Sequence, residues 1–292
     1  MLTRKQVAGL VALTLMWGLN WPMMKLSLRE ITPLWFRALT MTGGTLWLWW
    51  YYTHKGERMV PTRTELKTVA VLALPNMLGW HLLSILGVQE LSSGRAAILG
   101  FTMPVWAVLL GRVLFGQPLA PRVLWATLAT LVALALLLSH ELGTLTGRPW
   151  GVVWMELAAL SWALGTLMMR RAHLTLSMAA VTVGMMALSS AALWVLALVL
   201  EPFPSLDFSA VQWASLAYGV FINYGFAQII WFGMARNLPP ATSAISIMAV
   251  PVVGILSATF VVGEWPHWQD ALSILFVCGA IAAVLLPARV RV

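Results

Sequence analysis

The chain has 292 residues, of which 60% are hydrophobic and only 10% are charged, and its mean hydropathy is +0.85. So little polar surface excludes a soluble globular fold and indicates that lipid is the main solvent. The net charge of +8 does not indicate a nucleic-acid partner, because the basic residues lie in short connectors between long apolar runs.

Long apolar runs divide the chain into ten predicted membrane-spanning helices. A hydrocarbon core of about 30 Å needs roughly 20 apolar residues per helix, and charged residues, Pro and Gly bound runs of that size. The first run is too long for the apolar core of a signal peptide, so we expect it to be retained. The predicted spans are Gln6–Met24, Pro33–Tyr52, Val69–Gly87, Ala96–Phe115, Arg122–Ser139, Gly151–Met169, Ser177–Leu200, Ala210–Met234, Ala241–Val262 and Trp268–Leu286. The predicted fold class is therefore an all-α integral membrane protein in a lipid bilayer.

The basic residues predict the orientation of these spans. With the N-terminus in the cytoplasm, five of the 18 basic residues fall outside, namely Lys25, Arg29, Arg37, Arg95 and Arg148. The other basic residues fall inside, and the last two outer loops carry acidic residues only. The positive-inside rule thus predicts that both termini are cytoplasmic, in a multi-pass protein of the bacterial inner membrane.

The sequence contains no motif for catalysis, metal binding or ATP hydrolysis. Cys278 is the only cysteine, so neither an intramolecular disulfide nor a thiolate metal cluster can form. We find no H-E-x-x-H, G-x-S-x-G or Walker A pattern. We therefore predict a protein that is not an enzyme and that has no metal or cofactor, in which any energy coupling comes from an ion, a proton or the substrate gradient. Nothing requires an oligomer, and a monomer is compatible with the sequence.

Two halves of the chain resemble each other at a nearly constant offset. A shift of 145 residues aligns Trp17-Gly18-Leu19 with Trp162-Ala163-Leu164, and a shift of 147 aligns Pro104 with Pro251. Because each unit contains an odd number of spans, the second must enter the membrane in the opposite orientation. We predict two inverted five-helix repeats, residues 1–146 and 147–292, which suit alternating access around a midplane site.

These features resemble the drug/metabolite transporter superfamily of the EamA type over nearly the whole chain. The resemblance rests on the ten spans, Trp17-Gly18-Leu19-Asn20, Pro104, Pro251 and the short Gly-Gln/Glu elements that follow spans four and nine. Phe101-Thr102-Met103-Pro104 and Trp162-Ala163-Leu164-Gly165 are similar to segments of the YddG group of bacterial exporters, which implies aromatic and other neutral amino acids as substrates. The sequence departs from the family pattern at Gln117, where an acidic residue is expected.

Tryptophan is unusually frequent, with 17 residues. Near span ends the amphipathic indole suits the membrane interface. Inside spans the indole N–H needs a partner or a hydrated cavity, so those residues either line a pathway or pack between helices. The predicted interfacial set is Trp35, Trp49, Trp50, Trp150, Trp213, Trp265 and Trp268, and the interior set is Trp17, Trp80, Trp106, Trp162 and Trp231.

Prolines and polar residues mark further candidate positions inside the spans. Trp17, Asn20 and Trp21 share one face of span one, and Asn20 needs a partner, water or substrate at that depth. Pro22, Pro104 and Pro251 each free a backbone carbonyl, either at a kink satisfied by packing or at a ligand contact. We treat these three prolines as candidate hinges.

Ionisable and amide side chains inside spans complete the candidate site. Tyr224 and Gln228 lie on one face of span eight and suit either a zwitterionic substrate or a hydrogen bond between helices. His81 either faces a cavity or bonds a carbonyl, and Glu156 either couples protons or reaches water or a basic partner. Arg37 and Arg112 lie near span ends, where long stems reach the surface, so we expect both to be structural.

The leading hypothesis is a secondary exporter of neutral, aromatic and other apolar amino acids and related metabolites. An apolar aromatic wall would be formed by Trp17, Trp80, Phe101, Met103 and Trp162, with polar groups oriented by Asn20, His81, Tyr224 and Gln228. The alternative is a multidrug exporter, because such a wall also binds hydrophobic cations, although Glu156 is its only clear counter-charge. A channel or scaffold fits less well, since no filter motif is found and a scaffold needs no inverted repeat.

Overall fold

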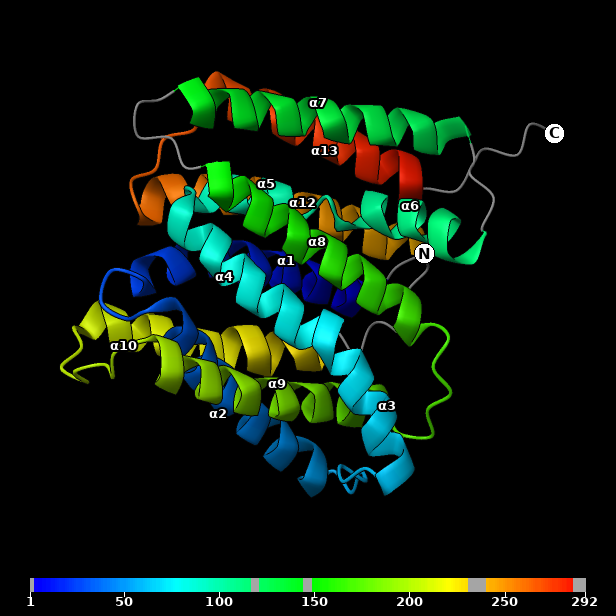
Figure 1. Cartoon of the computed structure of the whole chain (residues 1–292), viewed down its shortest axis with the longest axis vertical. Helices are drawn as coiled ribbons and strands as arrows, with labels where there is room; N and C mark the ends of the chain where they lie inside the picture. Colours follow the sequence, from blue (N-terminus) through cyan, green and yellow to red (C-terminus); the bar gives the residue numbers. More distant parts are fainter. Residues whose placement is uncertain (1–2, 117–120, 144–148, 231–239, 286–292) are drawn as a thin grey trace.

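The computed structural model describes residues 3–116, 121–143, 149–230 and 240–285, and the regular structure of these residues is helical. The helices are α1 (Arg4–Ser27), α2 (Pro33–His54), α3 (Arg63–Ala73), the π-helix η1 (Leu74–Gly79), α4 (Trp80–Glu90), α5 (Ser93–Gly100), α6 (Met103–Phe115), α7 (Pro121–Gly143), α8 (Pro149–Met169), α9 (Met178–Leu200), α10 (Ala210–Ala217), the π-helix η2 (Tyr218–Phe226), α12 (Pro240–Val261) and α13 (Trp268–Leu285). Within the described residues they group into ten membrane-length segments, which confirms the predicted number (Figure 1). The third segment is α3, η1 and α4, the fourth is α5 and α6, and the eighth begins with α10 and η2.

The fourth segment was predicted as one continuous span with a candidate hinge at Pro104, and it is broken just before this proline. α5 ends at Gly100, Phe101 and Thr102 form a turn, and α6 begins at Met103 with Pro104 in its first turn. Pro104 cannot donate a backbone hydrogen bond into the preceding turn, so a helix break is favoured there. By contrast, α1 and α12 continue through Pro22 and Pro251.

The helix contacts show that the two halves are related by an inverted pseudo-symmetry. α2 packs on its equivalent α9, and α7 packs on α13 (Figure 1). Other contacts are exchanged between the halves. The contact of α1 with α12 corresponds to that of α8 with α6, and the contact of α2 with η2 corresponds to that of α9 with η1. The two π-helices, η1 and η2, also fall in the equivalent third segment of each half. The chain is therefore an all-α protein of two inverted five-helix repeats.

Carboxylates fasten both ends of the α2–α9 pair in a symmetrical way. Just after α2, Glu57 accepts a hydrogen bond of 2.6 Å from the hydroxyl of Ser177, the residue that caps α9. Just after α9, Glu201 accepts backbone hydrogen bonds from Leu34 at 3.0 Å and Trp35 at 3.1 Å in the first turn of α2. Each helix thus begins where the other ends, so the two helices are antiparallel.

Removing the cap at the start of α2 is expected to destabilise the protein. Glu201→Ala leaves the amides of Leu34 and Trp35 without their carboxylate acceptor, and we expect a loss of about 1 kcal/mol in the free energy of unfolding. Denaturant unfolding of the detergent-solubilised protein measures this loss. Asp207→Ala, an exposed carboxylate in the same loop, is the control and should leave stability unchanged. Equal stability of the two variants would show that the cap contributes nothing.

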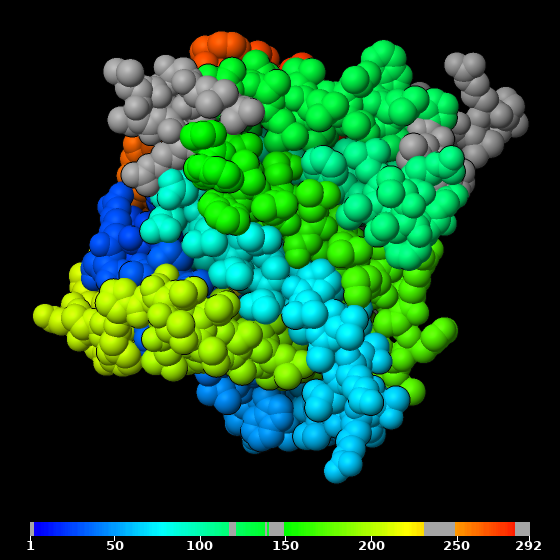
Figure 2. All heavy atoms as spheres, viewed as in Figure 1, coloured from blue at the N-terminus to red at the C-terminus, as the bar shows by residue number. Residues whose placement is uncertain are grey.

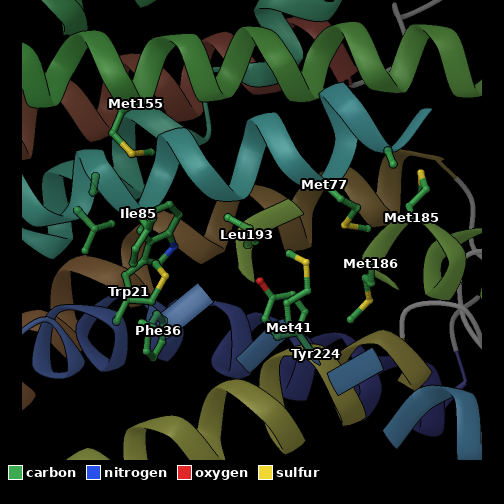
Figure 3. Close-up of a cluster of buried hydrophobic side chains, with 14 of the residues drawn as sticks. Trp21, Phe36, Met41, Met77, Ile85, Met155, Met185, Met186, Leu193 and Tyr224 are labelled. Carbon is green, nitrogen blue, oxygen red and sulfur yellow. The ribbon is translucent and has the colours of Figure 1, made fainter. Parts of the chain in front are cut away.

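The interior between the repeats is rich in methionine, and the outer surface is apolar. Met41, Met77, Met155 and Met186 are buried in the hydrophobic cluster shown in Figure 3, which also includes Tyr224. Unbranched thioether side chains fill irregular gaps and can repack when helices move. The face seen in Figure 2 is formed largely by α3, α4, α7, α8 and α9.

Large apolar side chains are exposed along the helices, including Leu198, Val199, Trp125 and Phe260. Five segments of the described chain are long and apolar enough to cross a bilayer by length and composition alone. They are Arg4–Ser27, Arg63–Glu90, Ser93–Phe115, Pro149–Met169 and Met178–Leu200. Apolar side chains facing outward are expected where lipid is the solvent, so this is a multi-pass membrane protein.

Candidate functional site

A buried network of polar side chains connects the two repeats. Arg37 on α2 donates from Nη1 to the Tyr224 hydroxyl at 3.3 Å and from Nη2 to the Ser84 hydroxyl at 3.2 Å. The Tyr224 hydroxyl also shares a hydrogen bond of 3.0 Å with Nδ1 of His81 on α4. Tyr224 belongs to η2 in the second repeat, whereas the other three residues belong to the first. This polar network therefore bridges the two halves of the chain.

Local backbone structure places Tyr224 against α2. Gly44 faces it, and a Cβ atom at this glycine would lie only 2.2 Å from the Cβ of Tyr224. Only glycine therefore lets α2 and η2 approach this closely. π-Helical turns are frequent at functional sites, and η2 carries Tyr224 and the buried Asn223.

A second polar group lies at the break in the fourth segment. Trp106 on α6 donates from Nε1 to Glu156 Oε2 on α8 at 2.6 Å. The Thr102 hydroxyl lies 3.3 Å from both oxygens of the same carboxylate and 2.7 Å from the Leu99 carbonyl. The N-terminus of α6 at this break favours a negative charge nearby. Glu156 thus bonds an indole and a hydroxyl. A basic partner was one of the alternatives expected from the sequence, and neither of these two groups is basic.

Aromatic side chains surround Gly100 at the end of α5. A Cβ atom there would lie 2.9 Å from the Trp21 ring, and 3.2 Å from both Trp80 and the methyl of Met155. Trp80 packs edge-to-face on Trp162 with ring centroids 5.4 Å apart, and Trp21 packs on Phe101 at 6.4 Å. The structure therefore brings together Trp80, Phe101 and Trp162 of the predicted aromatic wall. Trp21, which was not predicted as part of the wall, also belongs to this group.

The other predicted site residues lie around this core without joining one cluster. Trp17 and Met103 are half-buried and pack against the hydrophobic core. Asn20 and Gln228 are half-buried on α1 and just after η2. The predicted face of span eight assumes α-helical spacing, but Tyr224 lies in a π-helix, and Trp231 and Gln117 lie outside the described residues. The roles of these side chains stay predictions.

Two expectations from the sequence are wrong. Arg37 does not reach the surface, because its side chain is enclosed by α1, α4 and η2 and the residue is only 2% exposed. Trp35 is not interfacial either; it is 1% exposed and packs edge-to-face on Trp194 and Phe203, with ring centroids 5.1 and 5.0 Å apart. Tertiary packing covers both residues although they lie in the first turns of α2.

A signal for part of the site was present in the internal repeat. The offset of 147 residues pairs Asn76 with Asn223 and His81 with Gln228. Both asparagines are buried, one in each π-helix, and Asn76 donates to the Leu72 carbonyl at 3.0 Å. Extending the sequence alignment into spans three and eight would have identified these positions as equivalent.

A separate cavity of about 240 Å³ lies where α5, α12 and α13 meet. Its wall includes Arg95 and Asp270, whose buried side chains form an ion pair with Nε and Oδ1 2.7 Å apart. Glu264 accepts a hydrogen bond of 2.7 Å from the backbone N–H of Ser93. Both contacts join the first repeat to the second beside this cavity.

Removing the Tyr224 hydroxyl is expected to weaken the polar network. Tyr224→Phe leaves Nη1 of Arg37 and Nδ1 of His81 without their shared partner, and an unsatisfied buried polar group costs about 1–3 kcal/mol. Thermal or denaturant unfolding in detergent measures the loss. Tyr51→Phe, a half-buried tyrosine on α2 that contacts Tyr52, is the control. Wild-type stability in Tyr224→Phe would show that the network is not formed.

Inverted helical repeats with ionisable side chains buried between them define a membrane transporter. The chain belongs to the EamA-like transporter family, whose model matches residues 5–139 and 149–286. It is 20% identical to the uncharacterized transporter YoaV of Bacillus subtilis, with 95% of this chain and 93% of that protein covered. It is 25% identical to the uncharacterized inner membrane transporter YedA of Escherichia coli, with 95% and 90% covered.

A solved crystal structure shares the fold. Its TM-score is 0.69 and its sequence identity is 18%, with 98% of both chains covered. The family match confirms the predicted resemblance to EamA-type transporters, and the likeness to the solved structure bears on the fold alone. The names of the two relatives state no substrate.

Proposed function

We propose that this transporter exports neutral amino acids with aromatic and other apolar side chains, and related metabolites, across the bacterial inner membrane. The relative YedA is named an inner membrane transporter, which supports that location. The distribution of basic residues supports cytoplasmic termini. In Figure 1 the start of α1 and the end of α13 lie toward the same side of the molecule, as an even number of spans requires. We propose residues 1–146 and 147–292 as the two repeats.

The polar network of Arg37, Tyr224, His81 and Ser84 is the observation that carries this proposal. It joins both repeats, and His81 directly follows Trp80 of the aromatic group. Hydrogen-bonding groups beside aromatic rings suit a molecule with a polar head and an apolar side chain. Because the network lies between the repeats, rocking of one against the other would expose such a site to alternate sides of the membrane.

Export of hydrophobic cations is the second candidate function. Glu156 and Trp106 support it, because a carboxylate beside an indole ring attracts a cation by charge and by cation–π interaction. The same carboxylate supports proton coupling. It accepts hydrogen bonds from Thr102 in the break between α5 and α6 and from Trp106 on α6, so its protonation would change the contacts beside this break.

Transport by the purified protein in proteoliposomes tests these functions. We expect uptake of labelled phenylalanine and leucine, with lower rates for Trp162→Ala and His81→Ala, and a higher rate when a pH gradient is imposed. Movement of a lipophilic cation without movement of any amino acid would contradict the first function and support the second. If His81→Ala and Glu156→Gln both keep full gradient-dependent transport, neither residue couples protons.

A further inference from the structure

The Arg37 guanidinium is a buried cation whose acceptors are all neutral. Nη1 donates to the Tyr224 hydroxyl, and Nη2 donates to the Ser84 hydroxyl and to the Met24 sulfur at 2.9 Å. Among the residues that the structure describes, no carboxylate pairs with it. An arginine side chain is always charged, and a charge buried at membrane depth without an opposite charge is costly. The site is therefore short of one negative charge.

Among the described residues, one guanidinium nitrogen of Arg37 has no acceptor, and a second divides its two N–H groups between the Ser84 hydroxyl and a weak acceptor. Nε of Arg37 is buried and has no hydrogen-bond partner within the described part of the chain. Nη2 is partly occupied by the Met24 thioether, which is only a weak acceptor. A carboxylate binds the planar guanidinium fork through two parallel hydrogen bonds. One carboxylate replacing the thioether could therefore satisfy Nε and Nη2 together.

Two carboxylates of the protein, those of Glu201 and Glu156, already bond other groups. Glu201 caps the first turn of α2 by accepting from Leu34 and Trp35, and Glu156 accepts from Trp106. Moving either carboxylate to Arg37 would break these contacts. The missing negative charge is therefore better supplied from outside the protein.

The internal symmetry shows that the five-helix unit itself does not need this cation. α2 and α9 begin at Pro33 and Met178, and this offset of 145 residues pairs Arg37 with Thr182, which is buried at the equivalent place. The two helices pack on each other as equivalents although only one carries the charge. Arg37 therefore departs from the sequence symmetry at a place where the helix packing stays symmetrical. This difference indicates a role for the cation in only one of the two halves.

We propose that Arg37 recognises the carboxylate of the transported molecule, with the flexible Met24 side chain moving aside. This inference rests on the proposed function and narrows its substrates to carboxylates. Tyr224 and His81 complete the site from the other repeat and from α4. The protein then discriminates an amino acid from its ester or from the corresponding amine, which lack the carboxylate. It also disfavours simple hydrophobic cations.

Competition in proteoliposomes tests this proposal. Uptake of labelled phenylalanine is measured with unlabelled phenylalanine, 3-phenylpropionate, phenylalanine methyl ester or phenethylamine as competitor. We expect the two carboxylates to compete about tenfold or more better than the ester and the amine, since charge-assisted bidentate bonds contribute at least about 1.4 kcal/mol. Arg37→Gln should lose this discrimination, whereas Arg37→Lys should keep the preference with weaker competition. Arg112→Gln, an exposed arginine on α6, is the matched control and should behave as wild type.

The outcomes separate this inference from the proposed function. If the wild-type protein transports neither labelled phenylalanine nor labelled leucine, the proposed function is wrong. If it moves phenylalanine but the ester and the amine compete as well as the acids, the carboxylate role of Arg37 is overturned and the function stands. The wild-type comparison decides this even if Arg37→Gln fails to fold, and unchanged selectivity in a folded Arg37→Gln would overturn the proposal as well.

Discussion

Asp270→Ala is expected to lower the free energy of unfolding by about 3–5 kcal/mol, because it takes the carboxylate from a guanidinium that stays buried. Arg95 and Asp270 are 2.7 Å apart, with side chains only 7% and 6% exposed. Asp270 also accepts a hydrogen bond of 2.7 Å from the backbone N–H of His267 at the start of α13. The loss therefore affects both a contact between the repeats and a helix start. Denaturant unfolding in detergent, followed by circular dichroism, measures it.

An exposed ion pair provides the control for this prediction. Arg58 pairs with Glu65 at 2.6 Å, but its side chain is 51% exposed, so Arg58→Ala should cost no more than about 1 kcal/mol. The double variant Arg95→Met with Asp270→Leu should recover most of the stability lost in Asp270→Ala, because neither charge is then buried. Equal losses in Arg58→Ala and Asp270→Ala would contradict the importance of the buried pair.

Gly44→Ala is expected to impair both stability and transport. Its new Cβ atom would lie 2.2 Å from the Tyr224 Cβ, which cannot rotate away as the end of a flexible side chain can. The helices must separate, and such overpacking costs about 1–3 kcal/mol. The same shift moves the Tyr224 hydroxyl away from Arg37 and His81, so we expect the transport rate to fall about tenfold or more. Unfolding and proteoliposome flux are measured on the same preparation.

Gly279→Ala is the matched control for Gly44→Ala. Gly279 lies on α13, is exposed, and a Cβ atom there would meet nothing within 4 Å. Alanine is a better helix former than glycine, so stability should stay the same or rise by up to about 1 kcal/mol. Wild-type transport in Gly44→Ala would show that close contact between α2 and η2 is not required at the site.

Much of the fold could be predicted from local sequence. Apolar runs of spanning length, bounded by charge, gave the ten segments, and α2 begins at the predicted residue Pro33. Pro104 was a candidate hinge, but neither the full break at Phe101 and Thr102 nor the π-helix at Tyr218–Phe226 was predicted. Hydropathy does not distinguish a continuous helix from two half-helices, or an α-helical turn from a π-helical one.

The candidate site was only partly predictable because its contacts are long-range. His81, Tyr224 and Glu156 were identified as polar residues at membrane depth, but the hydrogen-bond partners of all three side chains come from the other repeat. Arg37 was expected to be structural because it lies near a span end. Its burial depends on how α4 and η2 pack over the first turns of α2, and no local pattern encodes that packing.

Substrate counterflow tests the central claim most directly, because a carrier with one site exposed alternately to each side exchanges substrates across the membrane. Proteoliposomes loaded with unlabelled phenylalanine are diluted into trace labelled phenylalanine without a pH gradient. We expect labelled substrate to accumulate transiently above its equilibrium level. The overshoot should vanish in vesicles that were not preloaded and should be strongly reduced in Gly44→Ala. Uptake that rises only to equilibrium, whatever the vesicles contain, would contradict the account.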